Sequence, residues 1–299
     1  MKDFGYKLLK GLFTLVAMLP LGVLYVFSDL LFLIIYFIVR YRRGLLDRNL
    51  AACFPDMPAE ERNRIRRKFY RNFADYIVET IKLLHISDEE MSERMTFENI
   101  ELIDRLTSEG KSVAVYFAHC GNWEWAPSMT LHVSRESLKT VDYCQVYRPL
   151  RNKTFDRLML AVRSRFGSYS FSKTTVLRDL IKLRRAGKLS VTGFMSDQKP
   201  SHGDPTVVTE FLNRPTAFIS GTEHLAARLG LAAIYWDTEK IGRGRYRITC
   251  RLLAENAADM SAGELTKAYA AMLQNTILRN PSIWLWTHNR WKYPVHQTT

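Results

Sequence analysis

A histidine and a glutamate, His119 and Glu124, are the residues of this chain best suited to proton transfer. On one continuous helix, residues five apart point about 140° away from each other, so the two side chains would diverge. If His119 instead ends a strand, Gly121 makes a turn and Glu124 enters the first turn of a helix, the imidazole and the carboxylate can meet. Such a pair would be a general base with its orienting carboxylate.

A histidine near a glutamate is, taken alone, more often structural than catalytic. The surrounding pattern favours catalysis, because the nearly uncharged run Ser112–Ala118 is typical of a strand buried on both faces of a mostly parallel sheet. Open α/β sheets bind their ligands at the carboxyl ends of such strands. Cys120 is not expected to be a nucleophile, because residues adjacent on a strand point to opposite faces.

Two later segments also end in polar residues and are predicted to form other walls of the same pocket. Val141–Val146 is predicted as a strand with Arg148 at its end. Leu189–Met195 is predicted as another strand, followed by Asp197 and Gln198. The remaining predicted elements are a helix at Phe155–Ala186, a loop or hairpin at Thr206–Phe218 that carries Arg214, a helix at Gly221–Leu229, a strand at Leu231–Trp236, a half-exposed strand around Arg243–Leu252 and a final helix at Ala262–Arg279.

Composition points to a basic protein with a substantial core. The 299 residues include 47% hydrophobic residues and carry a net charge of +13, which attracts nucleic acid, an anionic membrane or an acidic carrier protein. The four cysteines are scattered, as is usual for reduced thiols in a cytosol-facing protein. The chain has no Walker loop, dinucleotide glycine pattern, HExxH or paired CxxC, so we expect neither a cofactor nor a metal.

The N-terminal segment is predicted to contact a membrane. From Gly11 to Val39 the only charged residue is Asp29, and the run is long enough for about one span. Pro20 could divide it into two short helices, so spanning, re-entrant and interfacial arrangements all fit. Basic residues on both sides give only a slight preference for a cytoplasmic C-terminal flank. Pro58 then opens a helix with one apolar face and one strongly basic face, which suits anionic head groups or plain solvent.

The chain resembles the bacterial lipid A biosynthesis (late, HtrB-like) acyltransferases, which are related to the glycerophosphate-type acyltransferases with an HxxxxD/E motif. Five motifs in order carry the resemblance: HCGNWE at 119–124, VYRPLRN at 146–152, SDQ at 196–198, FLNRPTAF at 211–218 and WLWTHNRWK at 284–292. The segment KPSHGDP at 199–205 departs from the family pattern, which bears on acceptor and acyl-length specificity.

The resemblance implies transfer of a fatty acyl chain from acyl carrier protein to a hydroxyl group of a lipid A precursor, at the cytoplasmic face of the inner membrane. His119 would be the general base and Glu124 its partner. Oxyanion donors would be backbone amides near Gly121 and Asn122, or Arg148. Asp197 and Gln198 match further polar positions of the site, and Arg214 is a candidate phosphate contact.

The fold expected is α/β, with a mixed, mostly parallel sheet flanked by helices and an N-terminal membrane helix. Residues 1–45 are predicted to anchor the chain, and residues 46–299 to form the catalytic domain. Two rival functions remain: the same reaction on another membrane lipid (an aminolipid, a lysophospholipid or a glycolipid), and a non-catalytic, membrane-tethered protein that binds polyanions. Nucleic acid is not the expected partner, because the basic residues are spread over many elements.

Overall fold

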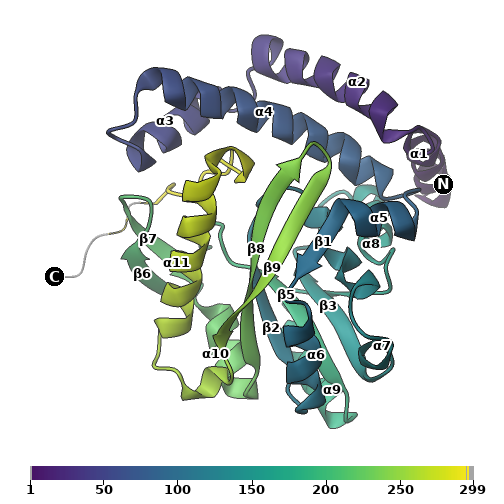
Figure 1. Cartoon of the computed structure of the whole chain (residues 1–299), viewed down its shortest axis with the longest axis vertical. Coiled ribbons are helices and arrows are strands. Elements are labelled where there is room, and N and C mark those ends of the chain that lie inside the picture. Colours follow the sequence, from purple (N-terminus) through teal and green to yellow (C-terminus); the bar gives the residue numbers. More distant parts are fainter. Residues whose placement is uncertain (1, 294, 296–299) are drawn as a thin grey trace.

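The computed structural model describes residues 2–293 and 295, and its centre is a seven-stranded sheet (Figure 1). The strand order is β1-β9-β8-β2-β5-β3-β4, and every neighbouring pair is parallel except β8 and β9. The predicted mixed, mostly parallel sheet is therefore confirmed. In chain order the strands are β1 (Met95–Glu98), β2 (Val113–Phe117), β3 (Val141–Tyr147), β4 (Tyr169–Ser172), β5 (Leu189–Met195), β8 (Ala232–Gly242) and β9 (Arg245–Ala254).

Each face of this sheet has its own hydrophobic core, because side chains alternate along every strand. On β2, Val113, Val115 and Phe117 belong to one core, and Ala114 and Tyr116 to the other. The first core is covered by α5 (Asp88–Arg94), α6 (Glu101–Ser108), the 3₁₀ helix η2 (Trp123–Leu131) and α8 (Lys153–Arg163). The second is covered by α9 (Val176–Arg185), α10 (Gly221–Leu229), α11 (Glu264–Arg279) and the 3₁₀ turn η4 (Pro281–Ile283).

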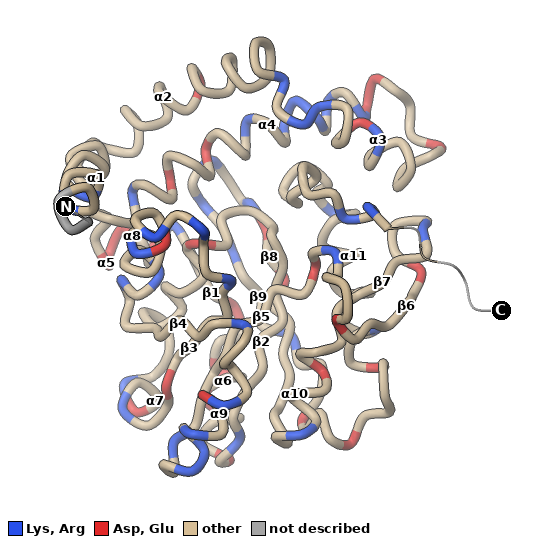
Figure 2. Tube along the Cα trace, turned by 180° about the vertical axis from the view of Figure 1, so that it is seen from behind, with Lys and Arg blue, Asp and Glu red and all other residues tan. Residues whose placement is uncertain are grey.

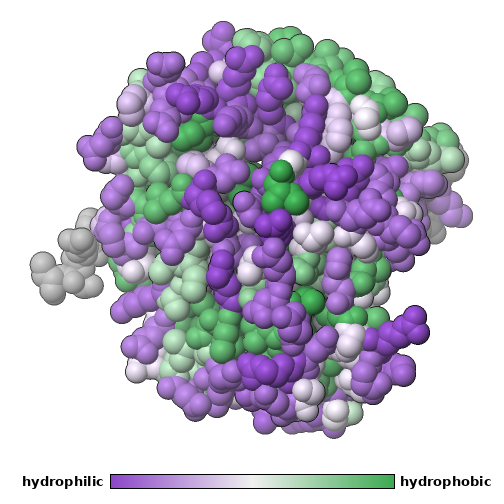
Figure 3. Space-filling view, in the orientation of Figure 1, coloured by the Kyte–Doolittle hydropathy of each residue, from purple (hydrophilic) through white to green (hydrophobic). Residues whose placement is uncertain are grey.

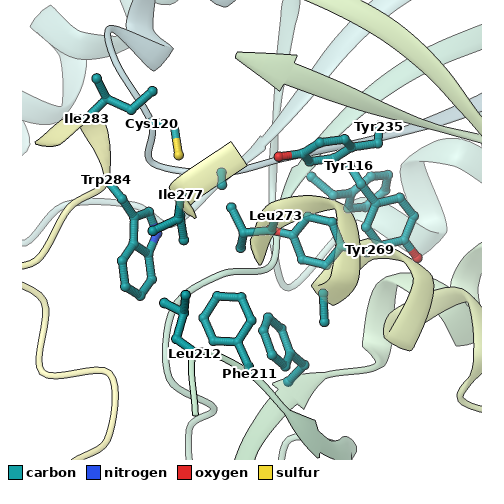
Figure 4. Close-up of a cluster of buried hydrophobic side chains, with 14 of the residues drawn as sticks. Tyr116, Cys120, Phe211, Leu212, Tyr235, Tyr269, Leu273, Ile277, Ile283 and Trp284 are labelled. Carbon is teal, nitrogen blue, oxygen red and sulfur yellow. The ribbon is translucent and has the colours of Figure 1, made fainter. Parts of the chain in front are cut away.

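Tyrosine rings fill the second core between the sheet and α11 (Figure 4). The ring of Tyr269 lies 5.2 Å from that of Tyr116 and 5.9 Å from that of Tyr235, centroid to centroid. Tyr269 also donates a hydrogen bond to the carbonyl of Phe117. Phe117 lies two residues before His119, so this hydrogen bond holds the end of β2 against the core.

The predicted helix Phe155–Ala186 is wrong in its middle. The chain forms α8, then the short strand β4, then α9. Gly167 interrupts the helical run with a left-handed φ of 83°, and β4 then pairs with β3 at the edge of the sheet. A strand of four residues has too few positions to show a period of two between helical patterns.

The N-terminal elements lie above the sheet in Figure 1, with α2 (Leu21–Leu33) over α4 (Ala59–Lys82). Pro20 separates α1 (Lys2–Ala17) from α2, as predicted, because it lacks a backbone N–H. A π-helical turn, η1 (Ile34–Ile38), extends α2 towards α3 (Arg43–Cys53). Within the described chain, Leu21–Ile38 is the helical segment long and apolar enough to cross a membrane, a property that core helices and signal sequences share.

Three smaller elements complete the fold beside the sheet. The predicted hairpin at Thr206–Phe218 is confirmed as β6 (Thr206–Glu210) paired antiparallel with β7 (Pro215–Ile219). A short helix, α7 (Arg135–Thr140), leads into β3, and the 3₁₀ turn η3 (Ala257–Asp259) follows β9. His119, just after β2, is contacted by Asp197 and Gln198 of the loop after β5 and by Leu285 of the C-terminal segment.

Candidate active site

The register of two neighbouring strands brings His119 to Asp197. In the parallel pair β2 and β5, Phe117 is opposite Met195, so the residues two positions later emerge side by side. The imidazole Nδ1 of His119 lies 2.7 Å from Oδ1 of Asp197, and the backbone N–H of His119 donates to Oδ2 at 3.1 Å. The carboxylate therefore holds both the ring and the backbone of the histidine.

Asp197 is buried yet well supplied with donors. Its side chain is 2% exposed, and the indole N–H of Trp284 donates to Oδ2 at 2.9 Å. Burial by itself raises the pKa of Asp197, but the charge of His119 and the hydrogen bonds from His119 and Trp284 lower it to about 2. An ionised Asp197 accepts a hydrogen bond from the Nδ1–H of the neutral imidazole, which leaves Nε2 of His119 with its lone pair.

Nε2 of His119 faces a cleft with a volume of about 720 Å³. The side-chain amide of Gln198 lies 3.1 Å from Nε2 and can donate to it. The imidazole is 14% exposed, so a substrate in the cleft can reach it while bulk water has little access. The arrangement is that of a general base oriented by a buried carboxylate.

The lining of the cleft divides into a basic part and an apolar part. Basic side chains come from the ends of β3, β4 and β5 and from α8 and α10; they are Arg148, Arg163, Lys173, Lys199, His224 and Arg228. Apolar side chains from β3, β5, β7, α9 and α10 form another wall; they are Val146, Val176, Leu177, Phe194, Ile219 and Leu225. The cleft can thus accept a molecule with anionic groups at one end and a hydrocarbon chain at the other.

Glu124 lines the cleft but does not orient His119, and this predicted contact is wrong. Its carboxylate accepts two hydrogen bonds from Arg163, from Nε at 2.8 Å and from Nη2 at 2.6 Å. Burial lowers the pKa of the Arg163 guanidinium, but the hydrogen bonds to Glu124 outweigh it and raise the pKa. The ring of Trp123, whose centroid lies 5.0 Å from that of His119, packs beside the imidazole. The strand register, rather than the spacing of five, therefore selects the partner of the histidine.

Gly121 and Asn122 do not line the cleft, so the predicted backbone donors are not placed there. The amide of Gly121 donates to the carbonyl of Ile283 at 2.9 Å, and its φ of 61° makes the predicted turn. A Cβ at this position would lie 3.0 Å from the ring of Tyr246, so the turn requires glycine. The Asn122 side chain is buried and donates to Glu79 at 2.9 Å.

Arg214 is also absent from the cleft lining, contrary to its predicted role. It lies in the turn between β6 and β7, with its guanidinium 4.6 Å from the centroid of the Trp291 ring. The neighbouring Asn213 donates to the carbonyl of Cys53 in α3. This turn therefore ties the C-terminal segment and α3 to the hairpin, away from His119.

The C-terminal segment supplies contacts that the sequence did not reveal. Leu285 donates from its backbone to the carbonyl of His119 at 3.1 Å, and Trp284 forms an isolated antiparallel bridge with Cys120. His288 accepts a hydrogen bond from the backbone of Lys199 at 3.2 Å. The tryptophan-rich segment is therefore part of the core and also contacts His119 and Asp197.

Covalent and metal chemistry find no support among the described residues. Cys120 is buried, and burial raises the pKa of its thiol well above the ordinary value. No group of three His, Cys, Asp or Glu side chains that could hold a metal ion occurs in residues 2–293 and 295. Asp197 and Gln198 are the side chains that form hydrogen bonds with the imidazole of His119.

Comparison with known proteins matches the chain to one family. A family model described as bacterial lipid A biosynthesis acyltransferase matches residues 2–293. The chain is 22% identical over 263 residues to the lipid A biosynthesis palmitoleoyltransferase of Escherichia coli K12, covering 85% of this chain and 80% of that protein. It is 22% identical over 284 residues to the lipid A biosynthesis lauroyltransferase of the same organism, covering 94% and 89%.

Proposed function

Since the chain belongs to the family of bacterial lipid A biosynthesis acyltransferases, we propose that it transfers a fatty acyl chain from acyl carrier protein to a hydroxyl group of a lipid A precursor. The two Escherichia coli relatives are named for palmitoleoyl and lauroyl transfer, which supports a fatty acyl group as the cargo. The non-catalytic, polyanion-binding alternative loses its support, because the family consists of acyltransferases.

In the proposed reaction Nε2 of His119 removes the proton from the acceptor hydroxyl. The oxygen attacks the thioester carbonyl, and the tetrahedral intermediate collapses with release of the carrier thiolate, to which the imidazolium returns the proton. Asp197 keeps the proton of the neutral imidazole on Nδ1 and stabilises the imidazolium that forms. A thioester is already activated, so no covalent intermediate on the enzyme is needed.

The developing oxyanion requires a hydrogen-bond donor close to Nε2. The side-chain amide of Gln198 lies 3.1 Å from Nε2, and Arg148 lines the same cleft. We assign the oxyanion to these two side chains in place of the backbone of Gly121 and Asn122. Glu124 remains part of the proposed site through Arg163, whose guanidinium it fixes at the cleft wall.

The two parts of the cleft fit the two substrates. Phosphate groups of the lipid acceptor, and the acidic surface of the carrier protein, suit the exposed Arg148, Lys173 and Arg228 at the rim. The acyl chain suits the apolar wall of α9 and β5. In this proposal residues 46–299 form the catalytic domain, and residues 1–45 anchor it to the inner membrane with the cleft on the cytoplasmic side, where acyl carrier protein is found.

The contact between His119 and Asp197 carries the proposal, and a purified enzyme tests it. The protein in detergent is incubated with acyl carrier protein loaded with a range of fatty acids and with a lipid A precursor, and products are identified by mass. We expect a gain of one acyl chain, reduced at least 10²-fold in His119→Ala. His85→Ala, at an exposed histidine outside the cleft, is the matched control and should retain activity.

The same assay separates the acceptors. If the precursor gains no mass but thioester is consumed when total membrane lipid is added, the acceptor is an aminolipid, a phospholipid or a glycolipid. If His119→Ala keeps full activity with any acceptor, the assignment of the base is wrong. If neither acceptor is acylated by the wild type, the proposed reaction itself fails.

A further inference from the structure

The helical segment that could cross a membrane is packed lengthwise against the catalytic domain. One face of α2 is buried against α4, through Leu21, Leu24, Ser28 and Phe32. These positions repeat every three to four residues, as one stripe of a helix does. Figure 2, seen from behind, shows α2 following α4 along the top of the molecule, as in Figure 1. A membrane span would instead be surrounded by lipid or by other spans.

Polar side chains fasten this contact. Ser28 donates to Asp75 of α4 at 2.7 Å. Arg243, in the turn between β8 and β9, binds both Asp29 of α2 and Asp75, at 2.8 Å each. Tyr25 donates to the buried Glu79 at 3.1 Å. The network joins α2, α4 and the central sheet, so these three elements move as one unit.

A spanning α2 would carry this charged network into the bilayer. The turn before Pro20 is also bound to α4, because the Lys82 ammonium donates to the carbonyls of Ala17 and Leu19 at 3.0 Å each. Each charged side chain at the bilayer centre costs roughly 2.5 to 3.5 kcal/mol. With 24 residues, α4 is about 36 Å long, longer than the bilayer core, and it lies beside α2 for much of this length. A crossing helix would therefore place α4 and its basic residues in lipid.

The opposite face of these helices is apolar and exposed. Figure 3 shows hydrophobic residues gathered along the edge of the molecule formed by α2. We call this set the apolar face; it consists of Leu8, Leu12, Leu15, Met18, Val23, Val26, Phe27, Leu30, Leu33, Ile34, Phe37, Ile38 and Val39. Val26 is 69% exposed and Ile38 76% exposed, so none of the residues that the structure describes covers the face. A patch of this size in a single chain marks an interaction surface.

Basic residues border the apolar face, and their charge indicates which kind of partner covers it. The Arg71 guanidinium of α4 lies 4.9 Å from the centroid of the Phe32 ring, at the edge of α2. Figure 2 shows further Lys and Arg residues along α3 and the adjoining end of α4. The exposed cations of the border are Lys7, Lys10, Arg40, Arg42, Arg64, Arg67, Lys68 and Arg71. Apolar residues bordered by cations match one leaflet of an anionic bilayer, with acyl chains below its head groups.

We propose that α1, α2 and η1 lie flat in one leaflet of an anionic membrane and do not cross it. The cleft is then held at the membrane surface, because α1 contacts α8, where the Arg157 guanidinium lies 4.1 Å from the centroid of the Tyr6 ring. Leu150 of the cleft rim and Phe155 of α8 are exposed as well. Given the proposed function, a lipid acceptor enters the cleft sideways, with its acyl chains still in the leaflet.

Accessibility of single cysteines tests the arrangement directly. Lys7→Cys lies before the apolar segment and Arg64→Cys lies after it, while the four native cysteines are buried. Sealed inverted membrane vesicles are treated with a membrane-impermeant maleimide, before and after addition of detergent. We expect both introduced cysteines to react in sealed vesicles to the same extent. Reaction of Lys7→Cys only after detergent, with Arg64→Cys reacting throughout, would show a spanning helix and overturn the proposal.

A second experiment identifies what the apolar face binds. The double variant Val26→Asp, Leu30→Asp changes two exposed residues of α2, and Leu138→Asp changes an exposed leucine of α7 as the matched control. Purified proteins are sedimented with vesicles of phosphatidylethanolamine and phosphatidylglycerol. We expect the double variant to bind at least tenfold more weakly and the control to bind normally, with equal thermal unfolding. Unchanged vesicle binding, or wild-type dimers that the double variant abolishes, would assign the face to another partner. Neither experiment measures acyl transfer, so the proposed reaction can fail independently.

Discussion

Asp197 and Glu124 are two buried carboxylates beside the same histidine, and they are held in different ways. Asp197 accepts hydrogen bonds from the backbone of His119, its imidazole and the indole of Trp284. Glu124 is bound by the guanidinium of Arg163 through two parallel hydrogen bonds. One carboxylate thus contacts the histidine directly, and the other fixes a cation in the wall of the cleft.

The difference shows how a short sequence spacing can mislead. Glu124 follows His119 by five residues, whereas Asp197 is separated from it by 78 positions. The closer residue in sequence lies in η2, where its side chain reaches α8. The more distant one lies at the end of the adjacent parallel strand, where neighbouring strands run about 4.8 Å apart. Each assignment predicts a different response to mutation.

The largest contrast is expected for Asp197→Asn. The asparagine amide carries no negative charge, so it cannot replace the carboxylate as acceptor of the hydrogen bond from Nδ1. The imidazole then loses its preferred tautomer and the stabilisation of its charged form. We expect kcat to fall by about 10² to 10⁴-fold with little change in KM. Steady-state acyl transfer measures this. Asp142→Asn, which alters only a partly exposed ion pair with Lys188, is the control. Normal turnover in Asp197→Asn would return the orienting role to Glu124.

Glu124→Gln and Arg163→Gln should behave alike if the two residues form a clamp. Removing either member leaves the other buried without its partner, which costs about 3 kcal/mol in the free energy of unfolding. The double variant should be less destabilised than the sum of the two single variants. Denaturant unfolding and KM for the lipid acceptor are measured for all three proteins. A defect in kcat confined to Glu124→Gln would show that this carboxylate acts on the base.

Trp284→Phe tests the support of Asp197 with a smaller change. Loss of the indole N–H leaves the carboxylate with fewer donors, so it holds the imidazolium of His119 more tightly. We expect the acid limb of the kcat/KM profile to move to higher pH, with kcat reduced by about tenfold at most. Trp286→Phe is the matched control, because that buried indole donates to the carbonyl of Pro281 instead. The same profile in both variants would limit Trp284 to packing.

The smallest effect is expected at His288, which adjoins the loop after β5. Burial lowers the pKa of His288 from 6.5 to about 4. The unfolded chain therefore binds a proton between these pH values that the folded protein does not, and stability falls as the pH drops from about 6.5 to 4. His288→Gln should reduce this loss of stability between pH 6.5 and 4 by on the order of 1 kcal/mol, a modest amount because the ring is partly exposed. An unchanged loss of stability in His288→Gln would contradict this assignment.

Local patterns in the sequence were sufficient to predict the sheet and the position of His119 at the end of one of its strands. Each of these predictions used only a few neighbouring residues. They were the uncharged run before His119, the polar residues after Met195 and the residue types near Arg148. They predicted three parallel strands, the edge of the sheet at which the cleft lies, and four residues of its lining, His119, Glu124, Arg148 and Gln198. The motifs also indicated the family that the comparisons identified. Strand burial and turn geometry are local properties, which is why they can be read in this way.

Contacts between distant segments were decided only by the tertiary structure. The partner of His119 depends on the register of β2 and β5, and the clamp of Glu124 depends on the packing of α8 against η2. Trp284 and Arg214 both belong to motifs of the resemblance. In the folded chain, however, Trp284 donates a hydrogen bond to Asp197, and Arg214 packs against Trp291. The apolar N-terminal segment likewise had the composition of a span, and its packing on α4 shows only in three dimensions. Composition sets what a segment can bury, but the surfaces available in the folded chain decide against what it is buried.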